Sequence, residues 1–175
     1  KILFTSNLPN PAPGDWGPFQ FFDEATDASF SENIYTSGSI LEYCIVEYSN
    51  ELKIDNSAPF IHFSEIRYNS ENGIRVSYPE NYFLIKNCDI HHNSRGLDVY
   101  GSPETIVFSY NTIRDNSPKG GGFAGSSTFS YNTIKNNSFL NNDNNWCNSC
   151  GGGIKIDNTD FNHNIITGNR NDFND

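Results

Sequence analysis

Three features of the sequence predict an all-β fold, a right-handed single-stranded parallel β-helix (β-solenoid) with about seven coils of roughly 22 residues each. A nine-residue motif recurs along most of the chain, and Asn and Gly stand at fixed places around it. The composition, with 14 Gly, 14 Phe, 9 Tyr and no Met, is poor in helix formers and rich in strand and turn formers. We therefore expect one β-helix domain over residues 1–175.

The motif reads apolar, x, x, Asn/Ser/Cys, x, Ile/Val, x, x, Asn/Ser. It occurs six times, at Leu41–Ser49, Ile61–Asn69, Ile85–Asn93, Phe108–Asn116, Phe129–Asn137 and Phe161–Asn169. The central aliphatic residues follow one another at intervals of 20, 24, 23, 21 and 32 residues. These intervals are too short for a pair of helices, and alternation over four to five residues punctuated by Asn is typical of strand-turn-strand. Each repeat is therefore predicted to form one coil.

Stacked coils place equivalent residues in columns. The leading apolar residues and the central Ile or Val residues should form two columns that point inward. The Asn residues should form two columns at corners, because Asn tolerates a left-handed backbone and its amide can bond to the backbone or to the amides above and below. A third strand in each coil is predicted to begin at Gly, in Gly73–Val76, Gly96–Val99, Gly121–Phe123 and Gly153–Ile156.

The repeat divides the chain into an irregular first coil, residues 1–38, and regular coils, residues 39–169. A loop insertion at 141–150 accounts for the one long interval. Cys44 and Cys88 fall in one column with Ser64 between them, so they should lie two coil heights apart, about 10 Å. Because this exceeds disulfide reach, we expect two buried free thiols.

The N-x-I-x-x-N…G-I-x-V coils, from about Ser39 to Asn169, resemble the parallel β-helix repeats of the pectate-lyase-like superfamily. The opening stretch, Ile2–Ser6 followed by Asn10–Gly17, resembles the start of β-helix regions in large secreted and cell-surface proteins of bacteria and archaea. This resemblance implies an extracellular or cell-surface location.

The charge pattern excludes one class of partner. The formal net charge is -10, and the Lys and Arg residues are spread thinly, which leaves no basic stripe for nucleic acid. No apolar run approaches the roughly 20 residues of a membrane span, so we expect no membrane insertion.

Outward residues beside the central Ile form the main candidate for chemistry. Glu65 stacks on Asp89, and Arg67, His91 and Arg114 stand beside them. In polysaccharide lyases of the fold that the chain resembles, acidic ladders hold calcium and an Arg or Lys removes a proton. Under that hypothesis Glu65 and Asp89 bind the metal, and Arg67, Arg114 or His91 acts as the base.

The alternative, which we favour, is that these charges pair with one another on a solvated sheet and that no residue is catalytic. His91 and His92 are then surface histidines. No cofactor is expected, and calcium enters only with the enzyme hypothesis.

The insertion contains Trp146, Cys147 and Cys150. A lone Cys-x-x-Cys also occurs in redox pairs and zinc sites, but with no second pair a local disulfide between Cys147 and Cys150 is favoured. Trp146, with Tyr110 and Tyr131 on the tyrosine-rich faces, would stack on a sugar ring or pack against a neighbouring subunit.

Both ends of the solenoid are expected to be uncapped, since neither shows an amphipathic helix or an atypical polar coil. We expect other copies of the chain to stack end to end on them, or a larger parent chain to continue them. The function that follows is a non-catalytic extracellular or cell-surface structural β-helix, an assembly (filament, sheath or surface-layer) or adhesion module that contacts glycans. The alternative is a polysaccharide lyase or hydrolase acting on an acidic glycan.

Overall fold

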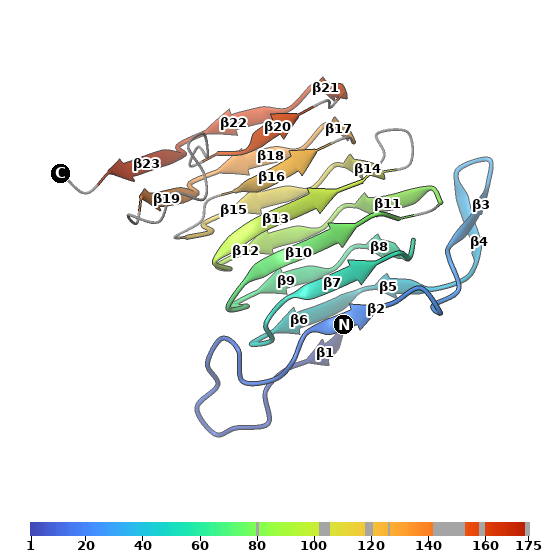
Figure 1. Cartoon of the computed structure of the whole chain (residues 1–175), viewed down its shortest axis with the longest axis horizontal. Coiled ribbons are helices and arrows are strands. Elements are labelled where there is room, and N and C mark those ends of the chain that lie inside the picture. The colour runs from blue at the N-terminus through green and yellow to red at the C-terminus, as the bar shows by residue number, and fades with distance from the viewer. Residues whose placement is uncertain are drawn as a thin grey trace.

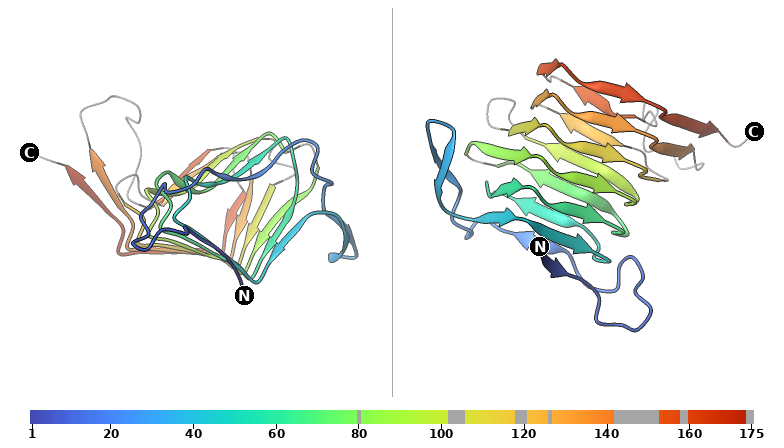
Figure 2. Two further views of the ribbon diagram at one scale, coloured as in Figure 1. Left: turned by 90° about the horizontal axis from the view of Figure 1, so that it is seen from below. Right: turned by 180° about the vertical axis from the view of Figure 1, so that it is seen from behind.

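A computed structural model describes residues 1–79, 81–101, 106–117, 121–125, 127–141, 153–157 and 160–173. The chain forms a parallel β-solenoid, with successive coils stacked along one axis from the N-terminal to the C-terminal end (Figure 1). Seen nearly along that axis, the coils superpose and three sheets surround a common interior (Figure 2, left). The predicted all-β solenoid is confirmed.

Sheet 1 has seven strands in the part of the chain that the structure describes. They are β1 (Ile2–Phe4), β6 (Cys44–Glu47), β9 (Glu65–Arg67), β12 (Asp89–His91), β15 (Thr112–Arg114), β18 (Thr133–Lys135) and β22 (Ile165–Thr167). Each strand pairs in parallel with its neighbour in this order.

Among the described residues, sheets 2 and 3 have six strands each and are also parallel. Sheet 2 contains β2 (Phe19–Phe21), β7 (Leu52–Asp55), β10 (Asn72–Ser77), β13 (Arg95–Tyr100), β16 (Gly122–Gly125) and β20 (Lys155–Asp157). Sheet 3 contains β5 (Ile40–Glu42), β8 (Phe60–His62), β11 (Phe83–Lys86), β14 (Ile106–Ser109), β17 (Thr128–Ser130) and β21 (Asp160–Asn162).

Within the described ranges, two strand pairs lie outside the coils. β3 (Ser29–Ser31) and β4 (Ile34–Ser37) form an antiparallel hairpin, and β19 (Ser138–Asn141) pairs in parallel with β23 (Arg170–Phe173). The second pair projects from the stack (Figure 2, left).

In each coil the chain runs from sheet 3 to sheet 1 and then to sheet 2. Within the described residues, four successive coils contain one strand of each sheet and no other strand: β5–β7, β8–β10, β11–β13 and β14–β16. The sequence-based number of about seven is higher because it includes the incomplete coils at both ends and the coil that β19 interrupts.

The interior contains the two apolar columns expected from the repeat, together with the inward residues of sheet 2. The central residues Val46, Ile66, Ile90, Ile113 and Ile134 are all 0% exposed. The leading apolar residues form the second column, in which the rings of Phe108 and Phe129 lie 5.6 Å apart. Because a fully buried aliphatic side chain contributes about 1.5–3 kcal/mol, these columns supply much of the driving force for coiling.

The Asn columns form hydrogen-bonded ladders. The long ladder, at the corner between sheets 1 and 2, consists of Asn69, Asn93, Asn116, Asn137 and Asn169. Each amide oxygen from Asn93 onward accepts bonds from the backbone N–H and the side-chain amide of the Asn one coil before. The same side chains donate to the carbonyl of a central Ile of the coil before. The short ladder of Asn111, Asn132 and Asn164 repeats this pattern between sheets 3 and 1.

The expected reason for Asn at these corners is wrong in one respect. The left-handed residue is not the ladder Asn but the residue before it, such as Tyr68 (φ 53°), Tyr110 (φ 57°) or Asp115 (φ 53°). Left-handed backbone costs a non-glycine residue about 1–2 kcal/mol. The ladder bonds of the following Asn offset that cost, so bulky aromatic residues occupy positions that Gly or Asn usually take.

Three of the four predicted glycines, Gly73, Gly96 and Gly121, are required by close packing between coils, because a Cβ on each would lie within 3.0 Å of a neighbouring coil. A Cβ at Gly96 would meet the carbonyl oxygen of Gly121 and would lie 2.6 Å from Cγ2 of Ile113. A side chain there would push two coils apart.

The N-terminal end of the core is partly covered by side chains, although the sequence predicts an uncapped end. Phe4, Trp16, Phe19 and Phe21 pack against the main core, and the rings of Phe4 and Phe19 meet edge to face at 4.7 Å. The β3–β4 hairpin packs through Phe30 on the outside of sheet 3. At the C-terminal end the last core position is open instead, because Ile166 is 53% exposed.

Cys44 and Cys88 are buried free thiols, as their column predicts. In this column the Cys44 N–H donates a hydrogen bond to Oγ of Ser64, at 3.1 Å. No helix in the described part of the chain is long and apolar enough to cross a membrane.

Candidate functional site

Sheet 1 brings the candidate residues together on its outer face. Because the central aliphatic residue of each strand points inward, the residues on either side of it point outward. Glu65 pairs in register with Asp89, and His91 lies between Arg67 and Arg114 in the neighbouring column. The five residues that the enzyme hypothesis requires are thus neighbours, at the positions predicted from the repeat.

Arg67 is held by two carboxylates. It donates to Glu47 and to Glu65, with both contacts at 2.7 Å. Burial opposes its positive charge, but the bonds to Glu47 and Glu65 outweigh burial and raise the pKa of Arg67 further. A general base must first be unprotonated, so this environment moves Arg67 away from that role.

Arg114 is held in the same way one coil further along. Its guanidinium contacts Asp89 through two nitrogen atoms, at 2.8 and 3.0 Å, and Asp115 at 2.9 Å. The hydrogen bonds to Asp89 are the largest cause of the raised pKa of Arg114, although partial burial opposes them.

His91 is buried, at 4% exposed, so the expectation of a surface histidine is wrong for this residue. Its Nε2 lies 3.1 Å from Oε1 of Glu65, and its Nδ1 lies 2.7 Å from Nδ1 of His92. Burial is the main cause of a lowered pKa at His91; attraction to Asp89 and Glu65 opposes it, and repulsion from Arg114 and His92 adds to it.

The hydrogen-bond network assigns the tautomer of His91. A carboxylate can only accept, so Nε2 of the neutral ring carries the proton that it donates to Glu65. Nδ1 then holds the lone pair and accepts a bond from Nδ1–H of His92. Both nitrogen atoms of His91 are therefore engaged, and neither is free for a metal or for a substrate proton.

The carboxylates Glu65 and Asp89 are also neutralised by protein cations. Glu65 contacts Lys1 at 3.2 Å as well as Arg67, and Arg114 holds Asp89. Burial raises the pKa of Glu65, but bonds from His91 and Lys1 and the charge of Arg67 outweigh it, so the net shift is downward. Among the described residues no group of three His, Cys, Asp or Glu side chains could hold a metal ion. The donor set does not fit calcium, because basic side chains already occupy it.

Tyr110 and Tyr131, the candidate partner contacts, lie beside this face at the corner between sheets 3 and 1. Both are half exposed, and their rings stack 4.9 Å apart at 5°. Trp146, Cys147 and Cys150 lie outside the described residues.

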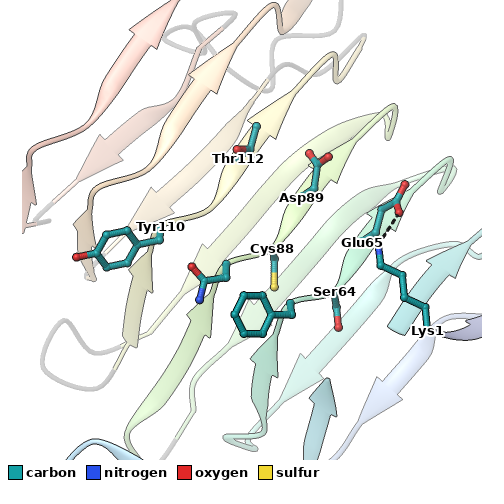
Figure 3. Close-up of a pocket in the computed structure, with 9 residues that line it drawn as sticks. Lys1, Ser64, Glu65, Cys88, Asp89, Tyr110 and Thr112 are labelled. Atoms are coloured by element: carbon teal, nitrogen blue, oxygen red, sulfur yellow. Dashed lines mark hydrogen bonds and ion pairs between the residues drawn. The ribbon is translucent and has the colours of Figure 1, made fainter. Parts of the chain in front are cut away.

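A cavity of about 420 Å³ opens at the same corner, between Tyr110 and the Glu65–Asp89 column. Figure 3 shows Tyr110 at one side of it and Lys1 reaching Glu65 at the other, with Asp89 and Thr112 along the sheet. Asn87 and Phe63 complete the lining with the buried Ser64 and Cys88. Sequence analysis did not identify this cavity, although the alignment contained its signal: Asn87 stands where four of the other five repeats have Tyr or Phe before the corner residue.

Comparison with known proteins agrees with the geometry. The family model described as "Right handed beta helix region" matches residues 25–173. No curated protein and no solved structure gave a significant match. The match covers every complete coil and is consistent with the pectate-lyase-like resemblance of the repeats. The chain therefore belongs to the family of right-handed β-helix regions.

Proposed function

We propose that this chain is a non-catalytic structural β-helix of the extracellular space or cell surface, and that it acts as an assembly or adhesion module. The observation that carries the proposal is the open edge at β22. Ile166 occupies the central core position of that strand and is 53% exposed, whereas the five equivalent residues of earlier coils are 0% exposed. A further coil laid on β22 would bury Ile166 and pair the strand.

The opposite end offers the partner for such a contact. Ile2 and Leu3 of β1 are 61% and 52% exposed, and in the described residues β1 pairs with β6 alone. A contact between the C-terminal edge of one copy and the N-terminal edge of the next is heterologous and does not close, so it builds a filament or sheath. A larger parent chain could supply the same pairing in place of a second copy.

The charged face of sheet 1 supports the non-catalytic part of the proposal. Arg67 and Arg114 each hold two carboxylates, and His91 uses both ring nitrogen atoms. On this proposal the five candidate residues have a structural role, since the ion pairs of Arg67 and Arg114 cancel charges that would otherwise repel their neighbours in the columns.

Two features support a location outside the cell. The opening residues resemble the β-helix regions of secreted and cell-surface proteins. The exposed rings at the corner beside sheet 1 suit contact with glycans, for which aromatic faces are common platforms.

Light scattering and electron microscopy of the purified chain test assembly. We expect the mean mass to rise with concentration and rods to appear whose width is that of a single solenoid. A monomer that persists at high concentration would contradict the proposal.

The alternative function is a polysaccharide lyase or hydrolase for acidic glycans, favoured by the gathering of Glu65, Asp89, Arg67, Arg114 and His91 on one face. An enzyme of the lyase type should gain thermal stability from calcium and release unsaturated product from acidic glycans. We expect neither effect; observing both would replace our proposal with this one.

A further inference from the structure

One column of side chains runs the length of the corner between sheets 3 and 1. This corner column consists of the left-handed residues Tyr43, Phe63, Asn87, Tyr110, Tyr131 and His163, with φ between 45° and 57°. The left-handed backbone turns each side chain outward, beyond the buried ladder residue that follows it. Five of the six residues carry rings.

The rings of the corner column stack coil upon coil. Tyr43 lies 5.2 Å from Phe63 at 7°, Tyr110 lies 4.9 Å from Tyr131 at 5°, and Tyr131 lies 4.8 Å from His163 at 10°. The centroid distances match the spacing of parallel strands, about 4.8 Å. The backbone thus holds aromatic faces nearly parallel and one strand spacing apart.

Asn87 interrupts this stack. Its coil lies between those of Phe63 and Tyr110, as the pairing of Lys86 with both His62 and Ser109 shows. Two strand spacings, about 10 Å, therefore separate the levels of the two rings, which is enough for one more ring between them. The Asn87 amide does not fill the space with a ring and instead contacts Nε2 of His62 at 3.1 Å.

The cavity of about 420 Å³ lies at this interruption, with Phe63, Asn87 and Tyr110 in its lining. This volume falls within the roughly 300–1,000 Å³ of small-ligand sites. The buried residues Ser64 and Cys88 close its inner edge, and the exposed rings of Phe63 and Tyr110 mark the outer edge, which opens to solvent. A ligand ring would enter edge first and have an aromatic face on either side.

Polar groups follow the side of the cavity that faces sheet 1. Glu65 and Asp89 present carboxylates fixed by Lys1 and Arg114, and Thr112 adds a hydroxyl (Figure 3). Fixed carboxylates accept bonds from hydroxyl groups, which a pyranose carries around its rim while its C–H faces suit aromatic rings. The Nζ of Lys86 lies over the Tyr110 ring, 5.6 Å from its centroid, while Tyr131 stacks on the ring as well. This flexible side chain must swing aside when a ligand ring enters, and it can then donate to the ligand.

The charge of the site argues against an acidic sugar. Lys1 and Arg114 already pair with Glu65 and Asp89, and the whole chain carries a formal net charge of -10. An acidic ring would add a third carboxylate beside these balanced pairs, whereas a neutral ring adds no charge.

We propose that the gap in the corner column is a binding slot for a neutral terminal pyranose, which stacks between Phe63 and Tyr110 and donates hydroxyl hydrogen bonds to Glu65 and Asp89. A terminal unit is specified because the closed inner edge leaves only the outer edge free for a glycosidic link. This inference rests on the adhesion role proposed above and adds a ligand class to it. It does not depend on end-to-end stacking.

The substitution Asn87→Tyr tests the slot by filling it. The left-handed backbone at this position accepts tyrosine, since Tyr110 and Tyr131 occupy the equivalent positions with φ of 57° and 56°. Asn136→Tyr is the matched control, because Asn136 shares the left-handed backbone of Asn87 (φ 54° and 57°) but is exposed and lies at the other corner of sheet 1.

Methyl glucoside, methyl galactoside and methyl mannoside serve as neutral probes, methyl glucuronide as the acidic probe, and indole as a planar aromatic probe. Binding is followed by saturation-transfer NMR and by ring-current shifts of the probe protons. We expect saturable binding of at least one neutral pyranoside, a loss of about tenfold or more in affinity with Asn87→Tyr, and no change with Asn136→Tyr. Thermal melts confirm that both variants are folded.

Three results would overturn the slot: no saturable binding of any neutral pyranoside, unchanged affinity in Asn87→Tyr, or tighter binding of methyl glucuronide or indole. If Asn87→Tyr does not fold, Phe63→Ala replaces it as the test. It removes one aromatic wall of the slot and should lower the affinity for the pyranoside in the same way. The stacking proposal fails separately, through a persistent monomer in light scattering, so the two failures are distinguishable.

Discussion

Asn116 shows how one buried polar side chain holds three coils together. It is 0% exposed, accepts from the backbone and side chain of Asn93, and donates to the carbonyl of Ile90 and to Asn137. Buried groups in such a ladder are stabilising only while every partner is present.

Replacing Asn116 with Ala should therefore lower the free energy of unfolding by about 2–4 kcal/mol, because it removes the partners of the Asn93 N–H and the Ile90 carbonyl. Urea denaturation measures this change. Asn10→Ala, in the exposed N-terminal loop, is the control and should change stability by less than about 0.5 kcal/mol. A similarly small effect at Asn116 would mean that the ladder does not stabilise the coils.

His91 predicts a pH dependence of stability. Its folded-state pKa is lowered, mainly by burial, from an ordinary value of 6.5. Below about pH 6.5 the unfolded chain takes up a proton that the folded chain does not, so stability falls as the pH drops from 6.5 toward the folded-state pKa. Glu65, whose pKa is also lowered, adds a further loss below about pH 4.5.

Thermal melts at about pH 7.5 and about pH 5.5 measure the His91 contribution. We expect His91→Gln, which retains a donor for Glu65 but does not titrate, to show a smaller drop in melting temperature than the parent chain. The control His163→Gln replaces an exposed histidine and should keep the parent drop. Equal drops in all three proteins would show that His91 does not cause the dependence.

Strand alternation was enough to predict which residues of the site lie side by side on the sheet. The register places Glu65 over Asp89 and His91 between Arg67 and Arg114, as the repeat indicates. The burial of His91 was not predictable, because it depends on side chains from neighbouring coils. The outward rings of the corner column were not predictable either, since Tyr and Phe rarely adopt a left-handed backbone and nothing local reveals that they do so here.

At the level of elements, the three sheets follow from the repeat. Alternation gives the inward columns, and the Asn and Gly positions give the corners and the start of sheet 2. The β3–β4 hairpin and the β19–β23 pair were missed because neither follows the repeat. The aromatic packing of Phe4, Trp16 and Phe19 at the N-terminal end was also missed, since it joins segments that only the folded chain brings together.

The register of sheets 1 and 3 can be tested through the two buried thiols. Cys44 and Cys88 are 4% and 3% exposed, and burial, opposed in part by backbone hydrogen bonds, raises the pKa of Cys88 to about 12. We therefore expect both to resist alkylation in the folded chain and to react once it is unfolded.

Mass spectrometry of alkylated peptides measures the modification of each cysteine separately. The unfolded chain is the control, because it should be modified at both Cys44 and Cys88. A disulfide between these two residues would contradict the register, which places Ser64 between them.

At the scale of the whole molecule, the solenoid is a stack whose interior and ladders continue to its edges. The N-terminal edge is partly covered by aromatic side chains, and the C-terminal edge exposes Ile166. The side face carries paired charges and the interrupted column of rings. Ends and side face are therefore separate surfaces, so stacking and ligand binding can occur in one assembly.

Stacking at the C-terminal edge depends on the core position of β22. Ile166→Asp places a charge where the next coil must pack and should keep the chain monomeric. Ile165→Asp alters the adjacent residue, which is 60% exposed and shares its outward column with Glu65 and Asp89, so it should leave stacking unchanged. Comparison of the two variants distinguishes the loss of the core contact at Ile166 from the effect of an added negative charge.

Sedimentation velocity of the parent chain and the two variants over a range of concentrations measures whether copies stack end to end. We expect a concentration-dependent series of larger species for the parent chain and Ile165→Asp, and a single monomeric species for Ile166→Asp. A parent chain that remains monomeric at every concentration, or an Ile166→Asp variant that assembles like the parent, would contradict end-to-end stacking.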